Sequence, residues 1–450
     1  MLKVIVPVLV LLVLVVGKKI PKIGGNVALA LAIAGLLALI MGGKVSPVDW
    51  ALAWIDGLDR LAWVIALSIA GSFYGETQGR IGALDTVVDL FRSMFGKSPR
   101  GLVVAVIIAI AVGGEAFGDA IGAASVIGIL VVPALVGLGM TGERIAATII
   151  FGCMLGSVMP PISQAVYLSC SILNIPTDNA INLTFISVGA VMVLCTVYAA
   201  FFFVKVKKLD EKYLPTQTPI EIIKNGIKGL LPLFLIVILI MCNSLFGVNV
   251  LATLLGPVYT TLSGIPVVKG LTNSIVMILI LASLVTFLWK DVRKEAGQIC
   301  IDALKGVSTS APIQICAALF VGALYAGGQI DAVTEFAMNL NDHVIKLGGG
   351  TALLLMGMLT GSQTTAQNIV FTFFGPILVN MGLNPDFVAI AGSHIAAGAQ
   401  TLPPSNLTAF VVASMVGSTL GKKVDPLRTM VECLPASIGL IVIGFIFLYI

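Results

Sequence analysis

The sequence contains few charged residues for its length. Only 11% of its 450 residues are Asp, Glu, Lys or Arg, whereas 58% are hydrophobic, and the formal net charge is +4. Soluble globular domains carry about 25% charged residues, so this composition excludes an ordinary soluble protein. No polar stretch is long enough to be a soluble domain, and many apolar runs have about 17–25 residues, the length of a membrane-crossing helix. The composition therefore predicts one multi-pass unit in a lipid bilayer.

Motifs for redox, metal, nucleotide or catalytic chemistry are also missing. The seven Cys residues are scattered without a Cys-x-x-Cys pair, which disfavours disulfides and a zinc site. The glycine-rich polar stretches carry neither nucleotide-binding fingerprint, and no Ser/His/Asp or His/Cys cluster occurs. His343 is expected at the surface, and His394 is expected in hydrogen-bonded packing. We therefore expect that the protein is not an enzyme and that it binds no nucleic acid.

A double proline occurs twice, each time inside an apolar segment long enough to be a helix. The copies are Pro160-Pro161 and Pro403-Pro404. Proline removes a backbone donor and clashes with the preceding turn, so a helix cannot continue intact through either copy. In lipid the freed peptide groups need a cavity, an ion or neighbouring protein. Paired interruptions in two halves of a chain are typical of the binding site of a secondary transporter.

The two double prolines belong to an internal repeat. Pro133 precedes Pro160 by 27 residues, and Pro376 precedes Pro403 by the same number. With an offset of 243 residues, positions 114–161 align without gaps to positions 357–404. The coinciding positions are mainly Gly and Pro, which control the backbone, so the alignment predicts that both halves adopt the same local structure.

Clusters of Lys and Arg predict how the halves are oriented. If Arg80 to Arg100 are cytoplasmic, counting membrane spans places the basic clusters at 205–212, 290–294 and 422–428 on the same side. We therefore predict an all-α integral membrane protein with two inverted-topology repeats, each containing a re-entrant helical hairpin and a proline-broken transmembrane helix. The predicted parts are a first repeat, 1–213, with its hairpin at 101–138 and broken helix at 143–176; a cytoplasmic linker, 214–226; and a second repeat, 227–450, with its hairpin at 350–382 and broken helix at 385–418.

Polar residues beside the interruptions are the candidate ligands. A half-helix that begins after a break exposes N–H groups, which suit a carboxylate, whereas the half-helix before it exposes carbonyls, which suit Na⁺. Hydroxyl and amide side chains would supply further neutral oxygens. The substrate-binding candidates are Ser163, Gln164, Thr364, Thr365, Asn368, Ser405 and Asn406. The candidate Na⁺ ligands are Gly118, Asp119, Ser125, Ser157, Gly361, Ser362, Gln400 and Thr401.

Two carboxylates, Glu115 and Asp119, lie one helical turn apart at the tip of the first hairpin. Intramembrane carboxylates are functional candidates, so this pair would bind Na⁺, relay a proton or attract a cationic substrate. The alternative is that the tip reaches cytoplasmic water and both side chains are solvated. Ser362, at the position matching Asp119, carries no charge, so the carboxylates are not part of the repeated pattern.

The hairpin and break motifs resemble a known family, the large membrane subunit of tripartite ATP-independent periplasmic (TRAP) transporters within the ion transporter superfamily. The matching motifs are Gly118-x4-Ala123-x4-Gly128-x4-Pro133 with Pro160-Pro161-Ile162-Ser163, and Gly382-x-Asn384-Pro385 with Leu402-Pro403-Pro404-Ser405-Asn406. The resemblance implies an inner-membrane elevator transporter, in which a transport domain slides against a scaffold. It implies Na⁺ near each hairpin tip and break, a carboxylate substrate between them, and two partners, a small membrane subunit and an extracytoplasmic binding protein.

The leading hypothesis is Na⁺-coupled uptake of a small organic anion. One alternative is a cation/proton antiporter that uses Glu115 and Asp119, and another is a related symporter that works without partners. A third hypothesis, from a different functional class, is a channel or a membrane scaffold. The sequence does not determine whether the protein forms a homodimer or what role residues 1–45 have.

Overall fold

The chain is predominantly helical in the part that this computed structural model describes: residues 2–16, 26–117, 120–210, 214–246, 249–308, 310–337, 341–403 and 406–450. No β-strand occurs in these ranges, which confirms the predicted all-α class. Among the described residues, three helices are long and apolar enough to cross a membrane, or five if two bent pairs each count as one span.

The first half contains these elements: α1 (Leu2–Val16), α2 (Val27–Met41), α3 (Pro47–Arg80), α4 (Ala83–Phe95), α5 (Pro99–Phe117), α6 (Ala120–Ala123), η1 (Ala124–Gly128), α7 (Ile129–Val136), α8 (Gly142–Val158), α9 (Gln164–Leu173), α10 (Asp178–Tyr198) and η2 (Ala199–Phe203). Here η1 and η2 are π-helical segments. The helix predicted to break at Pro160-Pro161 is divided into α8 and α9.

The second half begins with α11 (Pro219–Phe246), α12 (Val250–Leu254), α13 (Gly256–Ser263), η4 (Val268–Thr272), α14 (Ser274–Thr286), α15 (Lys290–Lys294), α16 (Ala296–Gly306), α17 (Ser310–Ala326) and α18 (Gln329–Ala337). It continues with α19 (Asp342–Thr360), α20 (Gln363–Ala366), η5 (Gln367–Phe371), α21 (Thr372–Asn380), α22 (Pro385–Gln400), α23 (Leu407–Leu420), α24 (Pro426–Glu432) and α25 (Leu434–Tyr449). Residues 250–268, which have no clear pattern in the sequence, form the short helices α12 and α13 and the start of η4.

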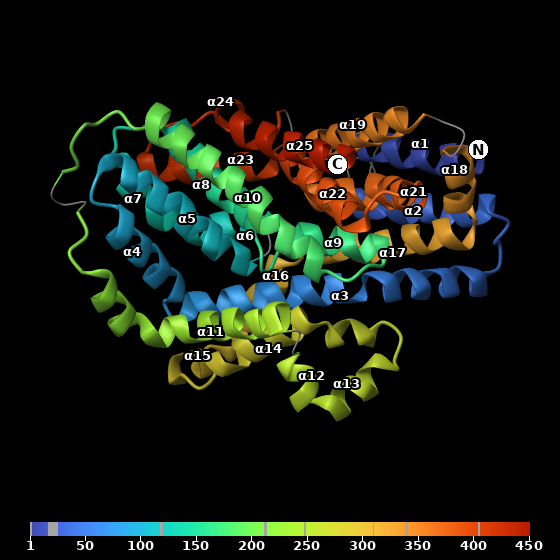
Figure 1. Ribbon diagram of the computed structural model, residues 1–450, viewed down its shortest axis with the longest axis horizontal. Helices are drawn as coiled ribbons and strands as arrows, with labels where there is room; N and C mark the ends of the chain where they lie inside the picture. Colours follow the sequence, from blue (N-terminus) through green and yellow to red (C-terminus); the bar gives the residue numbers. More distant parts are fainter. Residues whose placement is uncertain are drawn as a thin grey trace.

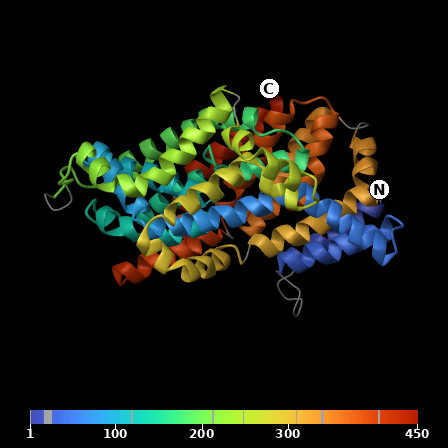
Figure 2. The same cartoon turned by 90° about the horizontal axis from the view of Figure 1, so that it is seen from below.

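Helix α3 is the longest element, with 34 residues, and lies along the molecule between two groups of helices (Figure 1). It packs against α17, which also packs against α2, and Figure 2 shows these N-terminal helices beside α17. The α3–α17 crossing is very close, because a Cβ at Gly57 would overlap the carbonyl oxygen of Ala318, and one at Gly322 would overlap that of Ala53. Small residues allow such backbone contact in membrane proteins, where dispersion rather than water exclusion drives helix association.

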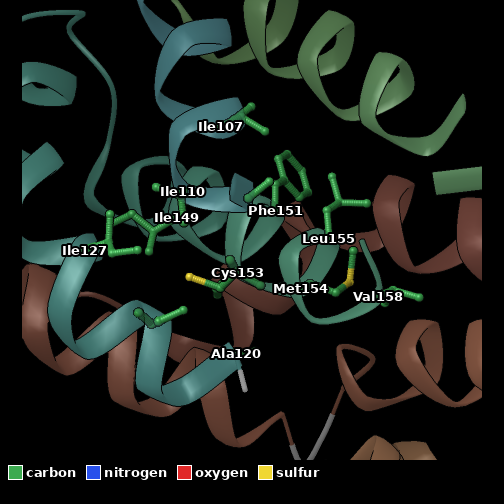
Figure 3. Packing of buried hydrophobic residues seen from close by; sticks show 14 of the residues in the cluster. Ile107, Ile110, Ala120, Ile127, Ile149, Phe151, Cys153, Met154, Leu155 and Val158 are labelled. Carbon is green, nitrogen blue, oxygen red and sulfur yellow. The ribbon is translucent and has the colours of Figure 1, made fainter. Parts of the chain in front are cut away.

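Helices α5 and α8 form the apolar core next to the first break. Figure 3 shows Ile107 and Ile110 of α5 beside Ile149 and Phe151 of α8, and all four side chains are fully buried. A Cβ at Gly156 of α8 would lie 2.6 Å from the carbonyl oxygen of Ala111. This contact holds the end of α8 against the end of α5, and so positions the first hairpin beside the first break.

The element boundaries follow the offset found in the sequence. Six elements of the first half each begin 243 residues before an element of the second half: α5 and α19, α6 and α20, η1 and η5, α7 and α21, α8 and α22, and α9 and α23. Two of the three described π-helical segments, η1 and η5, correspond in this way, although π-helices are rare and concentrate at functional sites. The opposite orientation of the two halves stays a prediction.

Candidate functional site

The first interruption separates α8 from α9 and is joined to the first hairpin by Glu115. The Glu115 carboxylate accepts a hydrogen bond from the Ile162 backbone N–H at 3.1 Å. Tyr167 donates its hydroxyl hydrogen bond to the carbonyl oxygen of Pro161 at 2.8 Å. Ser163 caps α9, because its hydroxyl oxygen accepts from the Val166 N–H at 3.3 Å. Side chains therefore satisfy several of the peptide groups that the double proline leaves unpaired.

Glu115 is buried, with only 7% of its surface exposed. It is not a solvated side chain at a hairpin tip, which was one of the two readings of the sequence. Tyr74 on α3 is also fully buried, and its hydroxyl has no hydrogen-bond partner. Burying a carboxylate in apolar surroundings is costly unless it is protonated, paired or bound to a cation. The position therefore suits a group whose charge changes during function.

The second interruption separates α22 from α23 and is held by a pair of amides. The Gln363 N–H donates to Oε1 of Gln400 at 3.2 Å, and Nε2 of Gln400 donates to Oε1 of Gln363 at 3.1 Å. Asn406 caps α23 by accepting from the Ala409 N–H, and its amide donates to the carbonyl oxygen of Thr401. This network joins the tip of the second hairpin to the second break.

The two interruptions contact one another. The Thr401 hydroxyl, beside the second break, lies 3.4 Å from the sulfur of Met154, one turn before the first break. Gln367 of η5 donates through Nε2 to the carbonyl oxygen of Ala165 and to the hydroxyl of Ser169, at 2.7 and 2.8 Å. The second hairpin is therefore hydrogen-bonded to α9, the half-helix that follows the first break.

Several buried polar groups beside this contact have no hydrogen-bond partner. They are the hydroxyl of Thr365, Oε1 of Gln367, and both Oδ1 and Nδ2 of Asn368. All three residues are fully buried. Thr365 and Asn368 are predicted substrate-binding residues, whereas Gln367 was missed, although its place next to Asn368 in an apolar segment was the available signal.

Other predicted ligands have structural partners. Gln164 donates to the Ser68 hydroxyl at 2.6 Å, and Ser68 also exchanges hydrogen bonds with Gln314 of α17. Ser157 donates to the carbonyl oxygen of Met154. Ser362 caps α20, Gly361 ends α19 at a φ of 64°, and Thr364 is half-buried in α20.

The remaining predictions fall where the structure is not described. Gly118, Asp119 and Ser405 lie outside the described residues, and the side chain of Ser125 is likewise not described. His394 is fully buried, and its two ring nitrogens contact the hydroxyls of Ser187 and Ser393 at 2.8 and 3.0 Å. No group of three His, Cys, Asp or Glu side chains that could hold a metal ion occurs in the described part of the chain.

Helices that break and meet inside an apolar, all-helical chain define a membrane protein of the secondary-transporter class. The family model "Tripartite ATP-independent periplasmic transporter, DctM component" matches residues 11–449, and the chain belongs to this family. It is therefore the large membrane component of a TRAP-type secondary transporter and not a member of an enzyme family. The family lies in the inner membrane and works with a small membrane subunit and a substrate-binding protein.

A solved structure shows a similar fold. The crystal structure of the Alcanivorax borkumensis YdaH transporter, described as having an unusual topology, superposes with a TM-score of 0.60 at 16% sequence identity. The similarity covers 88% of this chain and 86% of that chain. No curated protein matches the sequence.

Proposed function

We propose that the protein carries a small organic carboxylate across the membrane, coupled to Na⁺, by an elevator movement. The main supporting observation is the set of unpartnered polar atoms on Thr365 and Asn368, which are fully buried at the junction of the second hairpin and α9. An unsatisfied buried polar group costs about 1–3 kcal/mol, so such a set is retained where a ligand uses it.

The first break is less suited to the substrate carboxylate. Its Ile162 N–H already binds Glu115, and a second carboxylate there would be repelled by the first. Thr365 and Asn368 instead offer neutral O–H and N–H donors without a competing negative charge. We therefore assign the substrate carboxylate to the side of α9 that faces these two residues.

The oxygens for Na⁺ are those near the hairpin tips and breaks. Gln400, Thr401 and Ser362 present hard, neutral oxygens, which a monovalent cation prefers over soft ligands. When bound, Na⁺ would supply positive charge next to the substrate carboxylate. The residues themselves hold the tip and the break together through the Gln363–Gln400 amide pair.

A buried carboxylate also supports a second candidate function. Glu115 is a buried acid in contact with a broken helix, as a proton-coupled or cation-exchanging transporter requires. In that case Glu115 would be protonated in one half of the cycle and ionised in the other. Asp119, the other predicted coupling residue, lies outside the described residues.

The elevator movement would take place along α3 and α17. Half-helix α9 touches α3 through Gln164 and Ser68, through an edge contact of Tyr167 with Trp63, and through Ser171, which donates to the carbonyl oxygen of Arg60. These three contacts lie in a row along α9 and α3. Breaking and remaking such a row would allow the moving helices to slide against a fixed α3.

Proteoliposomes containing this chain, its small subunit and its binding protein would test the proposal. Uptake of the bound carboxylate should rise with an inward Na⁺ gradient and should be lost in Asn368→Leu, which keeps the volume but removes both amide atoms. If uptake ignores the Na⁺ gradient but follows a pH gradient, and Glu115→Gln removes that dependence, the second candidate replaces the first.

A further inference from the structure

Two side chains near the C-terminal end of α3, those of Tyr74 and Gln78, are buried without hydrogen-bond partners. The Tyr74 hydroxyl and both amide atoms of Gln78 are unpartnered, and the two residues are 0% and 2% exposed. They lie four positions apart, so they occupy the same face of the helix in successive turns. Unpaired polar groups in a protein interior are destabilising, so each one in a native structure needs an explanation.

This face of α3 is the one that contacts α9 nearer the middle of the helix. Arg60 accepts a hydrogen bond from α9 through its carbonyl oxygen, and Trp63 contacts α9 through its ring. Gln78 follows Arg60 by about five helical turns, and Tyr74 follows Trp63 by about three, so both return to the same side. Tyr74 also belongs to the buried apolar cluster that contains the side chains of α5 and α8. Tyr74 and Gln78 therefore extend the α9-facing side of α3 toward its C-terminal end.

Helix α9 lies beside α3 in an antiparallel direction (Figure 1). Three contacts set the register: Gln164 with Ser68, Tyr167 with Trp63, and Ser171 with Arg60. A displacement of two turns along α3, seven residues or about 11 Å, would bring the same faces together again. It would place Gln164 between Tyr74 and Gln78, and Ser171 beside Ser68.

The polar groups favour this direction of displacement over the opposite one. Two turns toward the N-terminal end of α3 would place Gln164 opposite Leu61 and Ser171 opposite Ala53, whose side chains have no polar atoms. Toward the C-terminal end, Gln164 would instead reach a hydroxyl and an amide that have no other partners. Ser171 would approach the Ser68 hydroxyl, from which Gln164 has moved away.

We propose that Tyr74 and Gln78 are positioning residues that hold α9, through Gln164, in the second state of the transport cycle. The proposal rests on the proposed function, because it takes α9 to slide along α3, and it adds the length of the step and the residues at its end. Gln164 would exchange its bond to Ser68 for bonds to Tyr74 and Gln78, so its amide would be paired in both states. This role explains why polar groups that are fully buried have no partners in the present state.

Cysteine cross-linking tests the second position of α9. In the full chain, with its seven native Cys changed to Ala and with its small subunit present in lipid nanodiscs, Gln164→Cys is combined with Ser68→Cys, Tyr74→Cys or Leu61→Cys and treated with Hg²⁺. We expect the Ser68 and Tyr74 pairs to cross-link. The Leu61 pair should not, although Leu61 lies a similar distance from Ser68 in the other direction. A reactive Ser68 pair shows that α9 is folded against α3, so an unreactive Tyr74 pair beside it, or equal reaction of the Tyr74 and Leu61 pairs, overturns the proposal.

The role of Gln78 is tested in the two pairs expected to react. Gln78→Leu keeps the volume but removes the amide, and it should lower the rate of the Tyr74 cross-link about fivefold relative to the Ser68 cross-link, as expected for one lost hydrogen bond. Gln329→Leu is the matched control, because Gln329 is also a buried amide but donates to the carbonyl oxygen of Ala38 on α2. The control should leave the ratio unchanged. The same ratio in both variants would assign Gln78 to the fold alone and would overturn its role.

Uptake in proteoliposomes keeps the two proposals apart. If carboxylate uptake follows the Na⁺ gradient but the Tyr74 pair does not cross-link, the second position fails and the proposed function stands. If the Tyr74 pair cross-links but no carboxylate is carried, the proposed substrate fails and the second position stands.

Discussion

Glu115 and the Ile162 N–H meet where the double proline prevents a helical hydrogen bond. Each group would be unsatisfied in lipid without the other, so the pair stabilises the break and places a titratable acid inside the protein. Thr365 and Asn368 differ from this pair, because the hydroxyl of Thr365 and the side-chain amide atoms of Asn368 are buried without hydrogen-bond partners. The two places therefore differ in chemistry, since one contains a buried acid and the other contains neutral polar groups.

Two substitutions of Glu115 separate its charge from its hydrogen bond. Gln keeps an oxygen that can accept from Ile162, so Glu115→Gln should leave the thermal unfolding temperature nearly unchanged while altering the ion or pH dependence of uptake. Glu115→Ala leaves a buried N–H unpaired and should cost about 1–3 kcal/mol of stability, measured by thermal unfolding in detergent. Equal stability of both variants would contradict the observed bond.

Two buried threonines of the second hairpin give a matched pair. The Thr365 hydroxyl has no partner, whereas that of Thr372 donates to the carbonyl oxygen of Asn368 at 3.0 Å. Thr365→Val should therefore keep or raise the unfolding temperature and reduce substrate uptake. Thr372→Val should lose about 0.5–1.5 kcal/mol of stability, because it removes a formed hydrogen bond. A destabilised Thr365→Val protein with normal uptake would show that this hydroxyl serves the fold.

The sequence identified some of these residues but not their partners. Polar residues in apolar segments drew attention to Thr365, Asn368 and Glu115. The sequence could not show that Gln164 binds Ser68, because these residues are 96 positions apart in the chain and their hydrogen bond depends on how α9 packs against α3. Nor could it show that Gln367 reaches α9, since a distant amide leaves no local pattern.

At the level of helices, the apolar and proline patterns predicted most elements, because interruptions at double prolines follow from backbone chemistry. The region 250–268 has no clear pattern in the sequence, since its structure depends on attachment to α3. There Asp59 binds both the Val267 N–H and the Lys269 side chain. Such tertiary attachment has no periodic signature.

Two glycines on α3 test the close crossing with α17. A Cβ at Gly57 would overlap the Ala318 carbonyl oxygen, whereas a Cβ at Gly79 meets nothing within 4 Å. Gly57→Ala should therefore lower the unfolding temperature and the folded yield, at a cost of about 1–3 kcal/mol. Gly79→Ala should be neutral or stabilising, because Ala favours helix over Gly by about 0.5–1 kcal/mol. Size-exclusion profiles and thermal unfolding in detergent measure both, and matching results for the two variants would argue against tight packing at Gly57.

For the whole molecule, the central expectation is that the two halves face opposite sides of the membrane. Thr141 and Asn384 are counterparts under the 243-residue offset, and both are exposed helix N-caps, of α8 and α22. In a background in which the exposed Cys300 is changed to Ser, Thr141→Cys should react with a membrane-impermeant thiol reagent from the cytoplasmic side only. Asn384→Cys should react from the opposite side only, and labelling of both from one side would exclude inverted repeats.

The hydrogen bonds between Gln367 and α9 also have a consequence for the evolution of such a chain. Neither half completes this contact alone, because the amide comes from one half and the carbonyl and hydroxyl oxygens that accept from it come from the other. A recombination event in the linker would combine each half with the other half of a different protein, in which α9 or the residue at position 367 had not evolved to make this contact. We therefore expect substitutions on the two sides of this contact to occur together.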